Sequence, residues 1–184
     1  MVKISMMITV KAMLAVIGRS ILFLAMVLIL AATGQAFAEN AVTGMRVGAV
    51  QIDDRTGLRL VIETKAPLKA NLLLLQSPYR LVIDMPKTKW DVDKLAPRGN
   101  LQVAPGSAYR FGNPKPEIGR LVIELEKPAA PVRVFTLPSA GAGSRFVIDL
   151  LDRGKTAFLV ASSALEKNPN IDLSDAVTDR AVVK

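Results

Sequence analysis

The pentapeptide RLVIE at residues 59–63 recurs as RLVID at 80–84, as RLVIE at 120–124 and as RFVID at 145–149. Each copy is short, rich in β-branched residues and polar at both ends, which is typical of a β-strand. Side chains alternate along a strand, so the Leu and Ile positions face one way and the Arg, Val and acidic positions face the other. The repeated phrase therefore predicts four strands with one apolar face each.

The four copies form two pairs, and each pair follows a related segment, MRVG at 45–48 or YRFG at 109–112. Matching positions in the two halves are separated by 64, 61 and 65 residues, as shown by Arg46 and Arg110, Arg59 and Arg120, and Arg80 and Arg145. Such near-constant offsets indicate an internal duplication.

One sheet built from half of this pattern would leave its apolar face in water, whereas two packed sheets bury both faces. The predicted fold is an all-β, two-sheet sandwich of about eight strands with an internal pseudo-two-fold duplication, spanning residues 42–152. Residues 153–184 are expected to hold a short helix over Thr156–Lys167, followed by a linker or tail.

Residues 1–38 have the features of a signal peptide, so we expect a signal-peptide helix ahead of the sandwich. Basic residues precede an uncharged apolar run at 21–32, and Ala36 and Ala38 form a small-x-small cleavage site. The alternative is an uncleaved membrane anchor, because residues 21–38 are uncharged and a span needs about 20 residues. Either way the body is predicted to lie in the periplasm, with membrane contact only through the leader.

The composition of the chain after residue 38, called the body here, limits the catalytic and binding chemistry that it can perform. The chain has 24 basic and 16 acidic residues, and three of the basic ones lie in residues 1–38, so the body has a mild basic excess that suits an anionic polymer. There is no His and no Cys, which removes the commonest general base and the usual zinc ligands. We therefore expect no catalytic residues, no metal and no cofactor. Asp53 and Asp54 are expected to form a solvated turn rather than a calcium site, and export argues against a nucleic-acid partner.

Several phrases resemble the AMIN domain, which is found at the N-terminus of periplasmic N-acetylmuramoyl-L-alanine amidases and in some pilus secretins. The similar stretches are PYRLVIDMP at 78–86 followed by Trp90, YRFG at 109–112, GRLVIELEKPAAPVRVFTL at 119–137 and SRFVIDL at 144–150. The resemblance implies a symmetrical two-sheet sandwich that binds peptidoglycan and brings its owner to the division septum. It also implies an amidase catalytic domain or divisome proteins as partners.

In the amidases a zinc-dependent catalytic domain with His and Glu ligands follows this module, and this chain has no His. The resemblance, together with the absence of His, therefore implies a non-catalytic module that targets cell-wall hydrolysis machinery. Two alternatives stay open. The chain is the N-terminal fragment of a zinc-dependent amidase whose catalytic domain is missing, or it is a periplasmic module of a secretin or pilus assembly.

The outward arginines are the candidate ligand-binding residues, because guanidinium groups bind carboxylates and phosphates through paired hydrogen bonds. The simpler alternative is that each arginine pairs with an acidic residue of a neighbouring strand. Tyr79 and Tyr109 are further candidates, for stacking on sugar rings, whereas Trp90 is expected to be buried in the core or under the crossover. The arginine candidates are Arg46, Arg59, Arg80, Arg110, Arg120 and Arg145.

Overall fold

The computed structural model describes residues 40–139 and 143–169 of the chain. The predicted signal peptide, its cleavage site at Ala36 and Ala38, and most of the predicted tail lie outside these residues. The predicted helix lies within them, and it begins two residues earlier than expected, as α2 (Gly154–Lys167).

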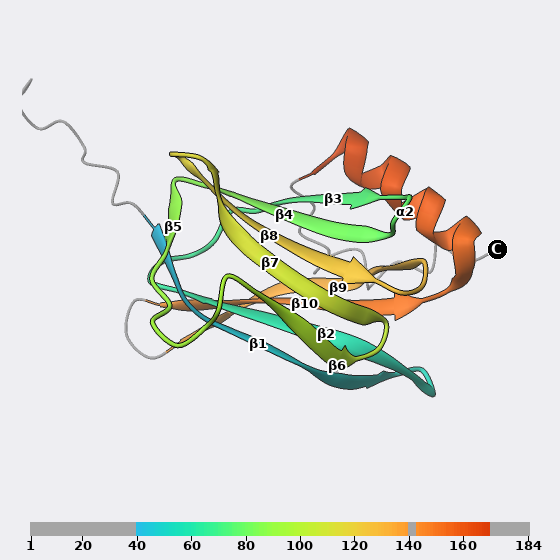
Figure 1. Cartoon of the computed structure of the whole chain (residues 1–184). Coiled ribbons are helices and arrows are strands. Elements are labelled where there is room, and N and C mark those ends of the chain that lie inside the picture. Colours follow the sequence, from blue (N-terminus) through green and yellow to red (C-terminus); the bar gives the residue numbers. More distant parts are fainter. Residues whose placement is uncertain (1–39, 140–142, 170–184) are drawn as a thin grey trace, which may run out of the picture. The chain divides into compact units, whose positions relative to one another are not determined.

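The predicted β-sandwich is confirmed, and the described residues form ten strands in two sheets of five (Figure 1). The four copies of the repeated phrase form β2, β4, β8 and β10. The two strands beyond the expected eight are the short β5 and β6, which lie in the crossover between the halves. The strands are β1 (Asn40–Ile52), β2 (Arg55–Thr64), β3 (Asn71–Leu75), β4 (Arg80–Pro86), β5 (Thr88–Trp90), β6 (Arg98–Val103), β7 (Gly106–Lys115), β8 (Ile118–Leu125), β9 (Ala129–Pro138) and β10 (Ser144–Asp152).

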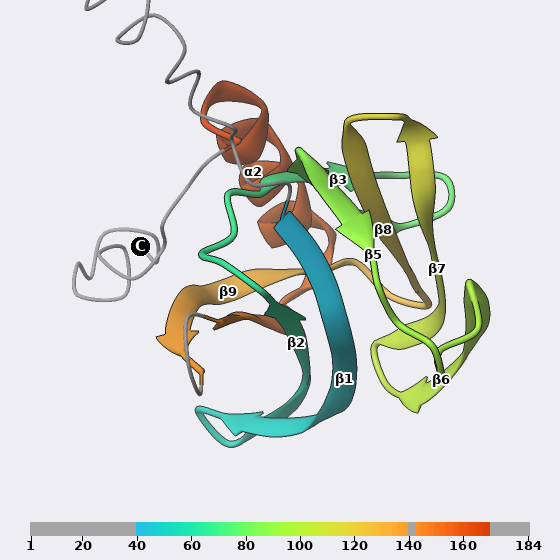
Figure 2. The same ribbon diagram turned by 90° about the vertical axis from the view of Figure 1, so that its left-hand side faces the viewer.

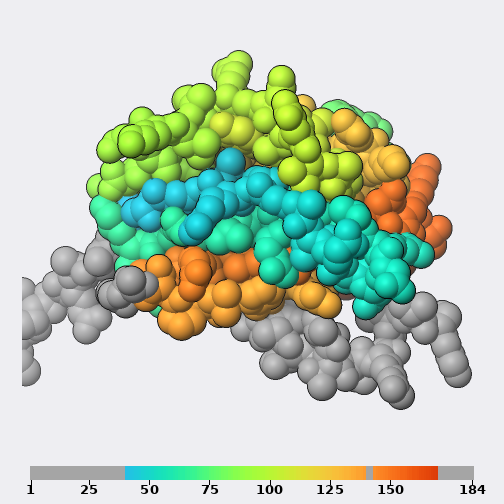
Figure 3. Space-filling view, turned by 90° about the horizontal axis from the view of Figure 1, so that it is seen from below, coloured from blue at the N-terminus to red at the C-terminus, as the bar shows by residue number. Residues whose placement is uncertain are grey.

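The two sheets are not the two halves of the sequence. One sheet, called sheet A here, has the order β5-β1-β2-β10-β9, and the other, sheet B, has the order β3-β4-β8-β7-β6. Each sheet thus joins the first hairpin of one half to the second hairpin of the other. In Figure 3, the surface of β1 and β2, in blue and teal, adjoins that of the orange C-terminal strands. This exchange pairs the four strands that carry the repeated phrase with one another, β2 with β10 and β4 with β8.

The duplication extends to the register of these central pairs. In sheet A, Arg59 lies opposite Asp149 and Glu63 opposite Arg145. In sheet B, Arg120 lies opposite Asp84 and Glu124 opposite Arg80. The two sets correspond through the offsets between the halves of the sequence. Arg59 and Glu63 correspond to Arg120 and Glu124, 61 residues later, and Asp149 and Arg145 correspond to Asp84 and Arg80, 65 residues earlier. The pseudo-two-fold relation is therefore present in the strand pairing as well as in the sequence.

The core lies between the sheets and is built from the Leu and Ile positions of the repeated phrase, as the alternation predicts. Seven of these eight side chains are fully buried, and Phe146, which replaces Leu in the fourth copy, is 7% exposed. The seven are Leu60, Ile62, Leu81, Ile83, Leu121, Ile123 and Ile148.

Other elements cover the two open edges of the sandwich (Figure 2). On one side α2 packs against β3 and β9, the edge strands of the two sheets, and buries Phe158 and Leu165. On the other side β5 pairs in parallel with β1, and the Trp90 ring stacks on Phe111 of β7 at 4.1 Å between centroids. The helix α2 and the strand β5 thus lie at opposite edges of the sandwich.

Two strand glycines in sheet A give a first test of this packing. A Cβ at Gly57 would lie 2.4 Å from the Leu150 carbonyl oxygen, whereas a Cβ at Gly48 would meet nothing within 4 Å. Because Gly57→Ala forces two backbones apart, we expect it to lower the free energy of unfolding by about 2 kcal/mol. Gly48→Ala is the matched control and should leave stability equal or slightly higher. Urea unfolding of both variants measures the difference, and equal stabilities would contradict the close approach of β2 and β10.

Candidate functional site

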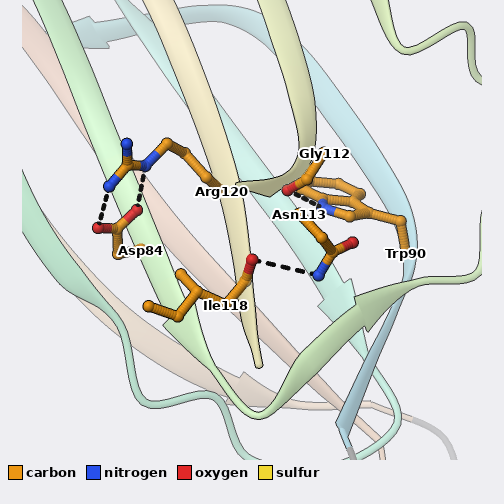
Figure 4. Close-up of polar contacts among 6 residues, drawn as sticks. All are labelled: Asp84, Trp90, Gly112, Asn113, Ile118 and Arg120. Atoms are coloured by element: carbon orange, nitrogen blue, oxygen red, sulfur yellow. Dashed lines mark hydrogen bonds and ion pairs between the residues drawn. The ribbon is translucent and has the colours of Figure 1, made fainter. Parts of the chain in front are cut away.

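The arginines at the centre of each sheet bind carboxylates across the strands. In sheet A, Arg59 donates from Nε and Nη2 to the two carboxylate oxygens of Asp149, at 2.7 and 2.8 Å. In sheet B, Arg120 donates in the same way to Asp84, at 2.6 and 2.7 Å (Figure 4). These symmetry-related pairs differ in burial, since the side chain of Asp149 is 0% exposed and that of Asp84 is 25% exposed.

Both central guanidinium groups are held in their charged form by these contacts. Hydrogen bonds to Asp149 raise the pKa of Arg59 above its ordinary value, and hydrogen bonds to Asp84 do the same to the pKa of Arg120. Arg59 also lies 5.8 Å from the ring centroid of Phe135. Arg59 and Arg120 are therefore engaged in the fold and have little capacity left for an external anion.

A second symmetry-related set of ion pairs joins the first two strands of each half. Arg46 of β1 donates to Glu63 of β2, and Arg110 of β7 donates to Glu124 of β8 at 3.1 Å. These pairs are more exposed than the central ones. Four of the six candidate arginines thus form the cross-strand ion pairs that the simpler interpretation predicted.

Arg80 and Arg145 differ from the other four, because neither forms an ion pair within the described parts of the chain. Each lies directly opposite a glutamate, but those carboxylates, of Glu124 and Glu63, bind Arg110 and Arg46 instead. Arg80 donates from Nε to the Pro78 carbonyl at 3.3 Å, and Arg145 donates from Nη2 to the Pro138 carbonyl at 3.0 Å.

These two contacts leave most of the donors of each guanidinium unused, since an arginine has five N–H groups. The Nε of Arg145 is moreover buried without a hydrogen-bond partner. An unsatisfied buried donor costs the fold about 1–3 kcal/mol, so the remaining N–H groups of the guanidinium, rather than Nε, are the ones available to a ligand. Arg80 and Arg145, which are equivalent in the duplication, are therefore the two candidates with capacity for an anion.

The aromatic candidates lie among side chains of the fold. The Tyr79 ring packs edge-on against Phe158 of α2 at 4.9 Å between centroids, and Tyr109 lies parallel to Phe111 at 6.4 Å. Trp90 is half-buried and donates from Nε1 to the Gly112 carbonyl at 3.2 Å (Figure 4). Each ring thus has an internal contact that accounts for its position.

The described residues offer no grouping of three or more His, Cys, Asp or Glu that could hold a metal ion. Asp53 and Asp54 both have positive φ, 46° and 61°, in the turn between β1 and β2, and Asp53 lies 3.6 Å from Arg153. Within the described ranges, no helix has the length and apolar character needed to cross a membrane.

The sequence predicted the arginines but not which of them are paired and which are free. Each arginine of the repeated phrase has an acidic residue four positions later, so the four copies look alike. The strand register places Arg145 opposite Glu63 and Arg80 opposite Glu124. The ion pairs show that these glutamates bind Arg46 and Arg110 instead. The positions of Leu75 opposite Arg80 and of Leu137 opposite Arg145 were also not predicted, because leucines at strand ends have no distinctive sequence pattern.

Comparison with protein families gives one result. A family model described as the AMIN domain matches residues 49–150, which include all four copies of the repeated phrase and exclude α2. No curated protein matches the chain.

Proposed function

The chain belongs to the AMIN domain family, and from this we propose that it is an exported, non-catalytic module that binds peptidoglycan and brings cell-wall hydrolysis machinery to the division septum. AMIN domains occur in periplasmic proteins, among them peptidoglycan-associated amidases and secretins. The proposed partners are accordingly peptidoglycan and an amidase catalytic domain or divisome proteins.

The observation that carries the binding proposal is the pair of free guanidinium groups, Arg80 on sheet B and Arg145 on sheet A. The peptide stems of peptidoglycan present free carboxylates, which match the planar fork of a guanidinium. The other four candidate arginines are neutralised by carboxylates of the fold. Binding of stem carboxylates is therefore expected at Arg80 and Arg145.

The test is co-sedimentation of the protein with purified peptidoglycan sacculi. We expect the double variant Arg80→Ala/Arg145→Ala to lose at least about tenfold in affinity, because a charge-assisted hydrogen bond contributes about 1.5–3 kcal/mol. Lys69→Ala/Lys115→Ala is the matched control, since it removes two positive charges from exposed positions outside the two strands that carry the arginines and should bind as the wild type does.

Equal loss in both double variants would show that net charge alone drives binding and would contradict a site at the arginines. Undiminished binding by a folded Arg80→Ala/Arg145→Ala protein would remove both residues from the site. In dividing cells, a fluorescent fusion of the wild type should gather at the septum and the double variant should not, which tests the targeting role separately.

A further inference from the structure

Each free arginine has a leucine as its direct cross-strand neighbour. Leu75 of β3 lies opposite Arg80, and Leu137 of β9 lies opposite Arg145. Directly opposed residues of an antiparallel pair point to the same side of the sheet. Leu137 is 41% exposed and Leu75 is half-buried, so an apolar side chain reaches the surface beside each guanidinium.

The two arginine–leucine pairs occupy equivalent places in the duplicated fold. Arg80 is the first residue of β4, and Arg145 is the second residue of β10. Each guanidinium donates to a proline carbonyl from the same hairpin, that of Pro78 or Pro138. One pair belongs to sheet B and the other to sheet A, so the pairs lie on opposite outer faces of the sandwich.

A guanidinium beside a leucine that reaches the surface suits a carboxylate that carries a small apolar group. The C-terminal alanine of a peptide stem has this combination, a terminal carboxylate and a methyl group on the adjacent carbon. A carboxylate within a longer polar side chain would engage the arginine but would bring no apolar group to the leucine.

We propose that Arg80 with Leu75 and Arg145 with Leu137 form two equivalent subsites, each for the C-terminal alanine of a peptide stem, so that one module bridges two stems. This inference rests on the proposed peptidoglycan binding and specifies its ligand and its valency. Two weak subsites on one body give tight attachment to a polymer that presents many stems, because the second contact forms at high effective concentration.

Calorimetric titration of the full chain with a soluble disaccharide–tetrapeptide that ends in alanine tests the ligand and the number of sites. We expect two sites in the wild type, one in Arg80→Ala, one in Arg145→Ala and none in the double variant. The same tetrapeptide with an amidated C-terminus should bind about 10- to 100-fold more weakly. Leu75→Ala and Leu137→Ala should weaken binding at their own subsites while the charge is unchanged.

A capture experiment tests the bridging. Sacculi coated with the wild type should retain a fluorescent soluble peptidoglycan fragment, whereas sacculi coated with either single variant should hold the protein but retain no fragment. A single site in the wild type, loss of all binding in one single variant, or equal affinity for the amidated probe would overturn this inference and leave peptidoglycan binding intact. Failure of the wild type to sediment with sacculi at all would instead overturn the proposed function, and the inference with it.

Discussion

Phe158→Ala is expected to lower the free energy of unfolding by about 3–5 kcal/mol, the usual cost of truncating a fully buried phenylalanine. Phe158 is 0% exposed and its ring contacts Tyr79 edge-on, and it holds α2 against the edges where β3 and β9 end the two sheets. Its loss leaves a cavity that the rigid strands cannot fill by collapsing. Urea denaturation of the full chain measures the effect.

Leu159→Ala is the matched control, because it shortens the next side chain of the same helix, which is 38% exposed. We expect it to change stability by about 0.5 kcal/mol or less. Equal effects of the two substitutions would show that α2 is not packed as described. A large effect of Phe158→Ala alone would establish that α2 is part of the folding unit, although the AMIN match ends at residue 150.

The second large effect is expected at the central ion pair of sheet A. Asp149→Ala should lower the free energy of unfolding by about 3 kcal/mol, because it removes both acceptors of Arg59 and leaves Arg133, 4.0 Å from Asp149, near an uncompensated charge. The symmetry-related Asp84→Ala should cost only about 1 kcal/mol, since the Asp84 side chain is 25% exposed and water already weakens its contact with Arg120, and among the described residues no second arginine is paired with it.

Thermal or urea unfolding of the two variants side by side checks this order. The comparison is well matched, because both substitutions remove one aspartate from the same register position of the duplicated fold. Equal costs would contradict the conclusion that burial, rather than the bidentate geometry shared by both pairs, sets the energy of these contacts. A larger cost at Asp84 would contradict it more directly.

Much of the fold was predictable because it depends on local pattern. The alternation in the repeated phrase placed Leu60 and Ile62 in the core, and the same reasoning held for the other three copies. The constant offsets predicted the duplication. The short β5 and β6 were not predicted, since their segments are rich in charged, Pro and Gly residues and pair only where the crossover meets the edges of the sheets.

The candidate site was predictable in composition but not in detail. All six arginines were identified, and four of them proved to be paired with carboxylates. The distinction between the free Arg80 and its paired neighbour Arg110 depends on which of them binds Glu124, a choice between two strands that lie on either side of β8. The packing of Tyr79 on Phe158 of α2 was equally unpredictable from the sequence, because these residues are 79 positions apart in the chain.

Side-chain alternation and repetition are properties of neighbouring residues, so the sequence predicted about eight of the strands, the faces that they bury and the two related halves. The combination of hairpins from both halves in each sheet, and the packing of α2 on the edge strands, became evident only in three dimensions. Among the residues that the structure describes, the strand pairing also leaves Arg80 and Arg145 without a carboxylate partner. Pairing between distant strands depends on how well whole faces pack together, and no single segment of the chain carries that information.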